Sequence, residues 1–231
     1  MASTVFTKRA PNRGVGASRP PFDSYNLALH VGDDPLAVAA NRATLGDEIG
    51  TDVKRIYYMN QVHGREIAVV NGADSSERLL DVDALYTRER GVALVVLVAD
   101  CIPLLIASES AIAAVHVGRR GLAAGIVERV LQQFARDRID ESDLRAEIGA
   151  SICADCYQVD SKSYEEVSSK YPAAATNQAL RKLDLTKAVT TLFSERGIAV
   201  RVARECTRHD SGYFSYRRDG QTGRQAGVIW L

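Results

Sequence analysis

The sequence predicts an α/β fold of the α+β kind, with mixed β-sheet and flanking helices in one layered domain over residues 1–231. Several short apolar runs rich in β-branched residues are bounded by turn residues, which is typical of strands. Helical segments lie between some of these runs, but without the strict alternation of a parallel sheet. The chain has 231 residues, 46% of them hydrophobic and 25% charged, which is enough for one large core.

Nine strands are expected. The clearest is the almost wholly apolar run at 92–99, which has the pattern of a strand buried on both faces. Asp100 and Pro103 should end it, because a proline cannot continue an interior ladder. The expected strands lie near residues 5–7, 55–60, 66–70, 83–87, 92–99, 111–116, 145–149, 198–203 and 226–230.

Four helices are expected. Asp34 can cap the first, with Pro35 at its first position, and it runs from Leu36 to about Leu45. A Gly/Arg turn at 118–121 should open a second helix from Leu122 to about Arg138. The other two are expected at 161–170 and 184–196, and Gly197 should end the second of these helices. The Gly/Pro/Arg-rich stretch at 8–21 is expected to be a surface loop.

Charge and composition exclude several classes of protein. The 29 basic and 29 acidic residues cancel, so no global field would recruit nucleic acid or an anionic membrane. The longest apolar run, at 91–107, is interrupted by Asp100 and Pro103 and is therefore core rather than a membrane span. The first ten residues have no apolar signal region, and four cysteines are too few for a disulfide scaffold. A cytoplasmic protein with reduced thiols is expected.

Three potential metal ligands follow or end predicted strands: His63, Cys101 and His116. Taken singly, each is more often a packed core residue than a ligand. Together, two histidines and one cysteine would leave one position of a tetrahedral Zn²⁺ ion open for water or substrate, as in catalytic zinc sites. Zn²⁺ is the simplest choice of metal, and Cu²⁺ can also bind by affinity order.

Two basic segments are candidates for anion binding. In the segment 118–121, two glycines permit close approach, Arg119 and Arg120 supply charge, and the following helix offers free N–H groups. The alternative is a turn with two solvated arginines. The second segment, 215–224, contains arginines whose guanidinium groups suit phosphate, but alone it would pass for an exposed hairpin.

The remaining cysteines and histidines receive less specific interpretations. Cys153 and Cys156 form a CxxC motif, but no second CxxC or thioredoxin-like context accompanies it, so they are interpreted as structural thiols. Cys206 and His209 can in principle bind metal, although no partner pair is evident. His30 is interpreted as a loop residue.

Many separate segments of the chain match one known sequence pattern in order and spacing. They are Tyr25–Leu27, His30–Pro35, Asn41–Arg42, Gln61–Gly64, Asp83–Leu85, Ala99–Pro103, His116–Gly121, Tyr157–Val159, Phe214–Arg218 and Thr222–Arg224. From about residue 5 to the C-terminus, the chain thereby resembles the YfiH-like laccase-domain family. Members of that family have been called polyphenol oxidases, peptidoglycan editing factors and purine nucleoside phosphorylases. The resemblance implies that His63, Cys101 and His116 are the metal ligands.

The preferred function implied by the resemblance is phosphorolysis of adenosine, inosine and methylthioadenosine, with accompanying adenosine deamination. Zn²⁺ would be the cofactor, with Cu²⁺ possible, and a purine nucleoside and phosphate would be the substrates. Arg42, Arg120 and Arg217 or Arg218 are expected to contact the anion. Asp100 is expected to support a ligand or handle a proton.

Two alternatives remain open at this point. One is a copper-dependent polyphenol oxidoreductase, with Met59 as the weak axial ligand of a single blue-copper centre. Four histidines are too few for the clusters of a multicopper oxidase. The other is a cell-wall (peptidoglycan) editing factor without nucleoside turnover.

The chain departs from the family pattern at positions outside the proposed ligands. Arg119 stands where the family often has Trp, and Gln158 where it usually has Glu. Gly149-Ala150 stands where it usually has Gly-Pro. These differences bear on substrate preference rather than on metal binding.

Overall fold

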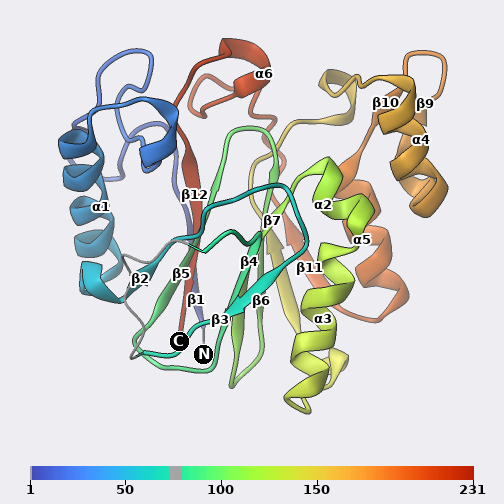
Figure 1. The fold of residues 1–231 in the computed structure, drawn as a ribbon, viewed down its shortest axis with the longest axis horizontal. Helices are drawn as coiled ribbons and strands as arrows, with labels where there is room; N and C mark the ends of the chain where they lie inside the picture. Colours follow the sequence, from blue (N-terminus) through green and yellow to red (C-terminus); the bar gives the residue numbers. More distant parts are fainter. Residues whose placement is uncertain (1, 73–79) are drawn as a thin grey trace.

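The computed structural model describes residues 2–72 and 80–231. Two β-sheets pack face to face, and helices cover the outer face of each (Figure 1). This arrangement confirms the mixed α/β fold with flanking helices that the sequence predicts. Both chain ends lie at the same end of the sheets, opposite α6 (Tyr216–Asp219) (Figure 1).

The larger sheet has six strands and mixed direction. Its outermost pairs, β11·β8 and β3·β4, are parallel, and the pairs between them are antiparallel. In spatial order the strands are β11 (Ala199–Val202), β8 (Arg145–Ile148), β6 (Ile102–Ala107), β7 (Ile112–Val117), β4 (Ala84–Thr87) and β3 (Ile67–Val69).

The smaller sheet has four strands, in the order β1 (Ser3–Phe6), β12 (Gln225–Trp230), β5 (Ala93–Val98) and β2 (Ile56–Tyr57). A separate two-stranded ribbon consists of β9 (Ala175–Asn177) and β10 (Lys182–Leu183). The chain passes from the smaller sheet to the larger one between β5 and β6, through residues 99–101. This crossing places Cys101 where the two sheets adjoin.

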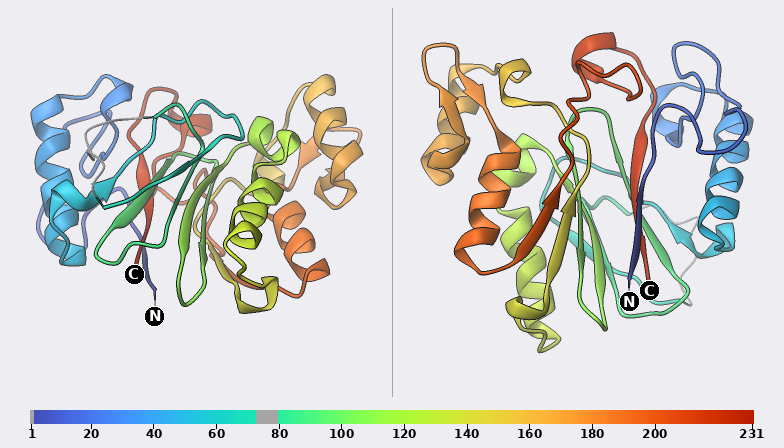
Figure 2. Two further views of the ribbon diagram at one scale, coloured as in Figure 1. Left: turned by 60° about the horizontal axis from the view of Figure 1, so that its bottom comes forward. Right: turned by 180° about the vertical axis from the view of Figure 1, so that it is seen from behind.

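Three of the helices begin at aspartate caps. Aspartates 34, 160 and 184 each accept a backbone N–H of the first turn of α1 (Pro35–Ile49), α4 (Ser161–Lys170) and α5 (Leu185–Glu195). Figure 2 shows α1 against the smaller sheet, and α3 (Ile126–Arg136) and α5 on the opposite side of the molecule.

The core has three layers, and β5 shows how the strands separate them. Ala93, Val95 and Leu97 face α1, whereas Leu94, Val96 and Val98 pack between the two sheets. All six are buried, which confirms the prediction of a strand covered on both faces. The third layer lies between the six-stranded sheet and its helices, where Phe134 of α3 contacts Tyr86 edge to face at a centroid distance of 5.0 Å.

Some predicted elements differ from the structure. Strand β6 was not expected, because Pro103 is its second residue; there it lies opposite His116, and its carbonyl accepts the Gly149 N–H. The helix expected from Leu122 begins already at Arg119 as α2 (Arg119–Ala124) and is separated from α3 by Gly125, whose φ is +88°. The strand expected at 55–60 is only two residues long.

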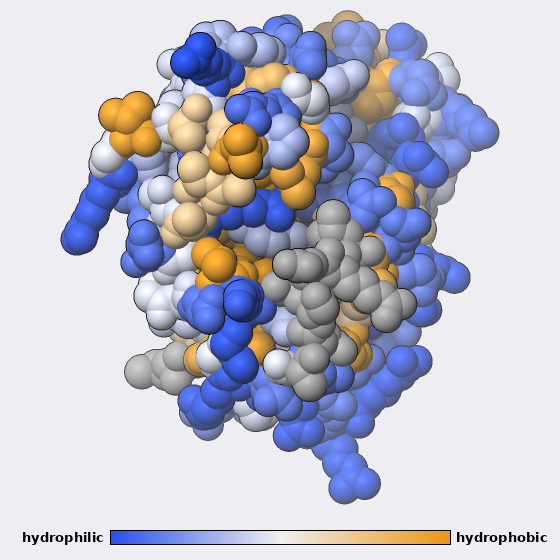
Figure 3. Space-filling view, turned by 60° about the vertical axis from the view of Figure 1, so that its left-hand side comes forward, coloured by the Kyte–Doolittle hydropathy of each residue, from blue (hydrophilic) through white to orange (hydrophobic). Residues whose placement is uncertain are grey.

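Among the described residues, no helix is both long enough and apolar enough to cross a membrane. On the side that carries α1, hydrophobic side chains form small patches among hydrophilic ones (Figure 3). Scattered apolar residues of this kind are normal for a protein surface.

Candidate metal centre

His63, Cys101 and His116 converge from three separate segments of the chain. Their donor atoms all lie within 4.8 Å of one another. The Cys101 Sγ is 4.0 Å from the His63 Nε2, and the two imidazole rings meet edge to face with centroids 4.7 Å apart. Donors around one tetrahedral Zn²⁺ ion are roughly 3.3–3.8 Å apart. The three residues therefore fit one metal ion with little adjustment.

Each ligand is placed by a different local structure. His63 lies in the loop after β2 with a positive φ of 59°, and Gln61 holds that loop to β5 through two hydrogen bonds with the Leu97 backbone. Cys101 lies in the crossing between the sheets, and His116 is the penultimate residue of β7. His63 is exposed and His116 is buried, so the metal would be reached from the His63 side.

Asp83 organises two of the three ligands, although the sequence pattern suggested no role for it beyond the family resemblance. Its fully buried carboxylate lies 2.7 Å from the His116 Nδ1 and also accepts the backbone N–H groups of His63 and Gly64, at 2.9 and 2.6 Å. This hydrogen bond leaves the His116 Nε2 for the metal. A carboxylate behind a histidine ligand is the usual way to fix its tautomer and ring orientation.

The same contacts set the charge of Asp83. Burial acts to raise its pKa, but the hydrogen bonds from His116 and Gly64 outweigh burial and hold the pKa below the ordinary value. Asp83 is therefore an anion at neutral pH, behind the proposed metal.

The thiol and imidazole of the centre also influence each other. Burial acts to raise the pKa of Cys101, but the charge of His116 and hydrogen bonds from both histidines lower it to about 6. Burial acts to lower the pKa of His116, while Cys101 and Asp83 raise it to about 9. A thiolate is thus available at neutral pH, which is the form that binds metal, whereas His116 is protonated and a metal ion would displace the proton from its Nε2.

Two glycines allow these segments to approach. A Cβ on Gly118 would lie 2.9 Å from the His63 Cδ2 and 3.3 Å from the Cys101 Sγ. A Cβ on Gly121 would lie 2.7 Å from the Gly64 carbonyl oxygen. In the 118–121 segment, glycine therefore makes room for the ligand loops.

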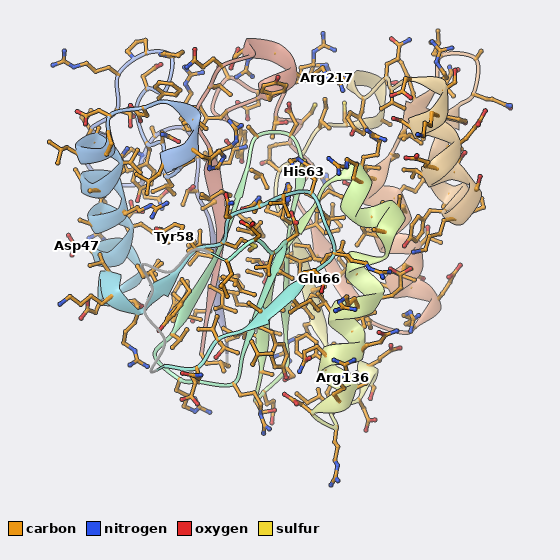
Figure 4. The ribbon with its side chains drawn as sticks, viewed as in Figure 1. Asp47, Tyr58, His63, Glu66, Arg136 and Arg217 are labelled. Atoms are coloured by element: carbon orange, nitrogen blue, oxygen red, sulfur yellow. The ribbon has the colours of Figure 1, made fainter. Side chains whose placement is uncertain are left out.

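A cavity of about 300 Å³ opens over the three ligands. This is within the usual size range for sites that bind small molecules. Arg217 and Arg224 bring positive charge into its lining, and Figure 4 shows Arg217 and His63 towards the same end of the sheets. The cavity is lined by His30, Gln61, His63, Leu97, Val98, Ala99, Asp100, Cys101, His116, Ile152, Tyr157, Tyr216, Arg217 and Arg224.

His30 is a further titratable residue in the lining of this cavity. It lies in a short 3₁₀ helix, Leu29–Val31, rather than in the loop that the sequence suggested. Burial and the positive charges of Arg224 and Arg42 lower its pKa. His30 is therefore uncharged at neutral pH, and the positive charge of the cavity lining comes from Arg217 and Arg224.

Asp100 holds the segment that carries Arg217. Its buried carboxylate accepts hydrogen bonds from the Thr207 hydroxyl at 2.6 Å, the Ser215 hydroxyl at 2.7 Å and the Arg217 backbone N–H at 2.6 Å. Its φ is +99°, an unusual value for a residue with a side chain. Asp100 thus lines the cavity and also fixes the start of α6.

The arginines predicted to bind anions occupy different environments. Arg42 stacks on Tyr58, with its Cζ 3.7 Å from the ring centroid, and donates to the Leu27 carbonyl. Arg218 donates to several backbone carbonyls, including those of Thr207 and Tyr213, and so braces the chain. Arg120 is exposed on the first turn of α2, outside the lining of the cavity.

Arg119 and Gln158, which depart from the family pattern, lie near one another at a neighbouring surface hollow that Arg217 also borders. Arg119 pairs with Glu166 at 3.6 Å, and the Gln158 carbonyl accepts from Arg217 at 2.8 Å. Met59, considered above as an axial copper ligand, is buried in the core between the sheets and does not line the cavity.

Arg224 and Tyr157 are cavity residues that sequence reasoning did not single out. Both lie in segments that resemble the family, and Arg224 also lies in the basic segment 215–224, but neither residue was given a role. Tyr157 follows the CxxC motif, and Arg217 lies over its ring at 5.1 Å. Their positions depend on long-range folding, which brings segments about 60–120 residues away beside Cys101.

The chain is similar in sequence to several known proteins. The chain is 40% identical over 225 residues to a purine nucleoside phosphorylase of Streptomyces coelicolor, covering 95% of this chain and 93% of that protein. It is also 40% identical over 233 residues to a purine nucleoside phosphorylase of Corynebacterium glutamicum, covering 98% and 93%.

Solved structures have the same fold. The crystal structure of YlmD from Geobacillus stearothermophilus superposes with a TM-score of 0.90 at 31% identity, covering 99% of this chain and 91% of that one. The Bacillus licheniformis hypothetical protein YfiH superposes with a TM-score of 0.91 at 29% identity, covering 100% and 92%. The family described as multi-copper polyphenol oxidoreductase laccase matches residues 4–231. The protein therefore belongs to this laccase-like family.

Proposed function

We propose that this protein is a metal-dependent purine nucleoside phosphorylase that acts on adenosine, inosine and methylthioadenosine and also deaminates adenosine. The observation that carries the proposal is the meeting of His63, Cys101 and His116 with Arg217 and Arg224 in one cavity. Relatives named purine nucleoside phosphorylase support the reaction class. In this proposal residues 1–231 act as one catalytic domain.

The metal would be held by His63, Cys101 and His116, and Zn²⁺ suits this set of donors. When bound, it would supply Lewis-acid stabilisation and activation of water through its open position. The described residues contribute the rest of the site: Asp83 keeps the His116 Nδ1 occupied, and Gly118 leaves space beside His63 and Cys101. Copper binding to the same donors is chemically reasonable as well.

Phosphate would bind between the guanidinium groups of Arg217 and Arg224, with His30 nearby. Guanidinium groups bind phosphate through charge-assisted, often bidentate, hydrogen bonds. Arg42 would add positive charge from behind His30, because it contributes to the lowered pKa of that histidine. The phosphate would then be positioned for attack on the sugar C1′. A direct contact from Arg120 stays a prediction.

The purine base would bind at the less polar part of the cavity, beside Leu97, Ile152 and Tyr157. Burial raises the pKa of Tyr157 to about 12, so its hydroxyl remains protonated and available as a donor. The flat faces of Tyr157 and the exposed Tyr216 suit a base that stacks. Asp100 would position Arg217 and Ser215 through its hydrogen bonds, and it would also handle a proton in the reaction.

The test is incubation of the zinc-loaded protein with adenosine and phosphate. We expect adenine and ribose 1-phosphate, together with inosine from deamination. Cys101→Ser should lose both activities and its metal, whereas Arg136→Ala, at the far end of α3 (Figure 4), should keep both. Release of base that does not depend on phosphate would contradict the phosphorylase assignment.

The same protein, loaded with copper in place of zinc, tests the two alternatives. A polyphenol oxidoreductase would oxidise phenols with copper and dioxygen and would ignore phosphate. The chain has four histidines, of which two are in the centre, and this disfavours a histidine-rich copper cluster. If neither nucleoside turnover nor phenol oxidation is found, a role in cell-wall editing becomes the better proposal.

A further inference from the structure

A second cluster of metal-binding side chains lies outside the cavity. The sequence showed no partner for Cys206 and His209, but the fold brings them to Cys153 and Cys156. The three Sγ atoms and one imidazole nitrogen lie within 4.8 Å of one another. The Cys156 Sγ is 3.0 Å from the His209 Nε2, and the Cys206 Sγ accepts the Cys153 backbone N–H at 3.3 Å.

The chemistry of the four side chains suits one metal ion. Three cysteines and one histidine are a full ligand set for structural zinc, and each pair has the short spacing typical of such sites. Sulfur and nitrogen donors of a tetrahedral zinc site are roughly 3.5–3.8 Å apart, which is close to the size of this cluster. N–H donation to a ligand sulfur is the kind of outer contact that accompanies metal thiolates.

We propose that Cys153, Cys156, Cys206 and His209 bind a structural zinc ion. With four protein ligands the site would be closed, in contrast to the three-ligand centre in the cavity. The earlier interpretation of Cys153 and Cys156 as structural thiols without a metal is thereby replaced. This inference does not depend on the proposed function, because none of the four residues lines the cavity.

The alternative is a redox-active CxxC pair. A disulfide between Cys153 and Cys156 would explain the position of those two residues. It would not explain why the Cys206 thiol and the His209 imidazole lie within 4.8 Å of them. Zinc would use all four donors at once and protect the thiols from oxidation. The convergence of two pairs, one from each side of a long intervening segment, therefore favours the metal.

The proposed ion would fasten two segments that border the catalytic cavity. Cys153 and Cys156 lie in the segment between Ile152 and Tyr157, which both line the cavity. Cys206 is followed by Thr207, whose hydroxyl donates to Asp100 at 2.6 Å. Ser151 and Cys206 also form a backbone bridge. The zinc ion would thus fix the position of Tyr157 relative to Thr207, which donates a hydrogen bond to Asp100.

The first experiment measures metal per chain by elemental mass spectrometry after expression with added zinc and removal of loose metal. We expect about two zinc ions in the unaltered protein. The double variant His63→Ala, Cys101→Ala should keep one, and Cys153→Ser, Cys206→Ser should lose the other. A Glu205→Gln variant, one residue from Cys206, is the matched control and should keep both.

The second measurement uses the variant His63→Ala, Cys101→Ala, which retains only the cluster. Its three remaining cysteines should resist a thiol reagent until a strong chelator is added. Cobalt loading of this variant should give the intense visible absorption of a tetrahedral, thiolate-rich site. Neither readout depends on enzyme activity, so failure of the proposed function would leave both unchanged.

Three outcomes would overturn the proposal. The first is an unaltered protein that holds no more than one zinc ion, with that ion lost from the His63→Ala, Cys101→Ala variant. The second is reaction of the thiols of that variant at the same rate with and without chelator. The third is a disulfide among Cys153, Cys156 and Cys206, detected by mass spectrometry of freshly prepared protein. If the serine variants fail to fold, the zinc content of the unaltered protein and the zinc content and thiol reactivity of the His63→Ala, Cys101→Ala variant still decide the matter.

Discussion

At the residue scale, Asp83 connects the core to the metal centre. It is buried, and its two carboxylate oxygens serve His116 and the turn at His63 and Gly64. Replacement by asparagine would put an N–H₂ group against these donors and would allow the wrong histidine tautomer. We expect Asp83→Asn to weaken zinc affinity roughly 10–100-fold.

Competition with a chromophoric chelator measures this affinity. Asp81→Asn is the control, because Asp81 is exposed and lies only two residues away. Circular dichroism should show that both variants are folded. An unchanged zinc affinity in Asp83→Asn would mean that its hydrogen bond to His116 does not position the ligand.

Gly118 supports a second prediction at this scale. Its missing side chain provides the space in which His63 and Cys101 approach each other. We expect Gly118→Ala to reduce zinc content and activity together, because a Cβ 2.9 Å from His63 must displace that ring. Gly72→Ala is the control, since the new Cβ would meet the flexible end of Arg55. Full zinc occupancy in Gly118→Ala would show that the ligand loop is more adaptable than its packing indicates.

At the scale of elements, the short helix α6 and the strand β12 bring Arg217 and Arg224 to the cavity. We expect Arg217→Ala and Arg224→Ala each to raise the KM for phosphate, because one charge-assisted contact contributes roughly 1.5–3 kcal/mol, or about tenfold to a hundredfold in affinity. Zinc content should stay the same. Arg136→Ala is the control, and steady-state kinetics at varied phosphate is the measurement.

Arg120→Ala, measured in the same series, tests the position that the sequence favoured. Exposure of Arg120 on α2 leads us to expect a smaller rise in the KM for phosphate than at Arg217 or Arg224. A rise equal to theirs would place the phosphate at the start of α2 instead.

Elements with strong local signals could be predicted from the sequence, and those that depend on distant partners could not. The strand 92–99 and the aspartate-capped helices have the apolar pattern and caps that act within a few residues. Strand β6 was missed because Pro103 argues against a strand locally, whereas the six-stranded sheet accepts it at the strand's start. Gly125 divided a helix that hydrophobic periodicity alone would continue.

The same distinction applies to the sites. His63, Cys101 and His116 could be proposed because each follows or ends a recognisable apolar strand and matches a family motif. The second cluster was missed because Cys156 and His209 are 53 residues apart and belong to two irregular segments. The parallel pairing of β8 with β11 and the bridge between Ser151 and Cys206 bring those segments together.

At the scale of the whole molecule, stability and chemistry reside in different parts of the fold. The layer between the six-stranded sheet and α3 contains large buried side chains, whereas the cavity lies where β5 crosses to β6. This separation means that a change in the helix-side core can alter the free energy of unfolding without touching a ligand.

Phe134→Ala tests that separation. Phe134 is fully buried on α3 and contacts Tyr86, so its truncation should lower the free energy of unfolding by roughly 3–5 kcal/mol. Zinc content and kcat/KM per folded molecule should remain near those of the parent, because the ring packs in the helix layer and does not line the cavity. Urea unfolding with added zinc held constant gives the first quantity, and kinetics below the transition gives the second. Parallel losses of stability and kcat/KM would show that the helix layer also sets the geometry of the metal centre.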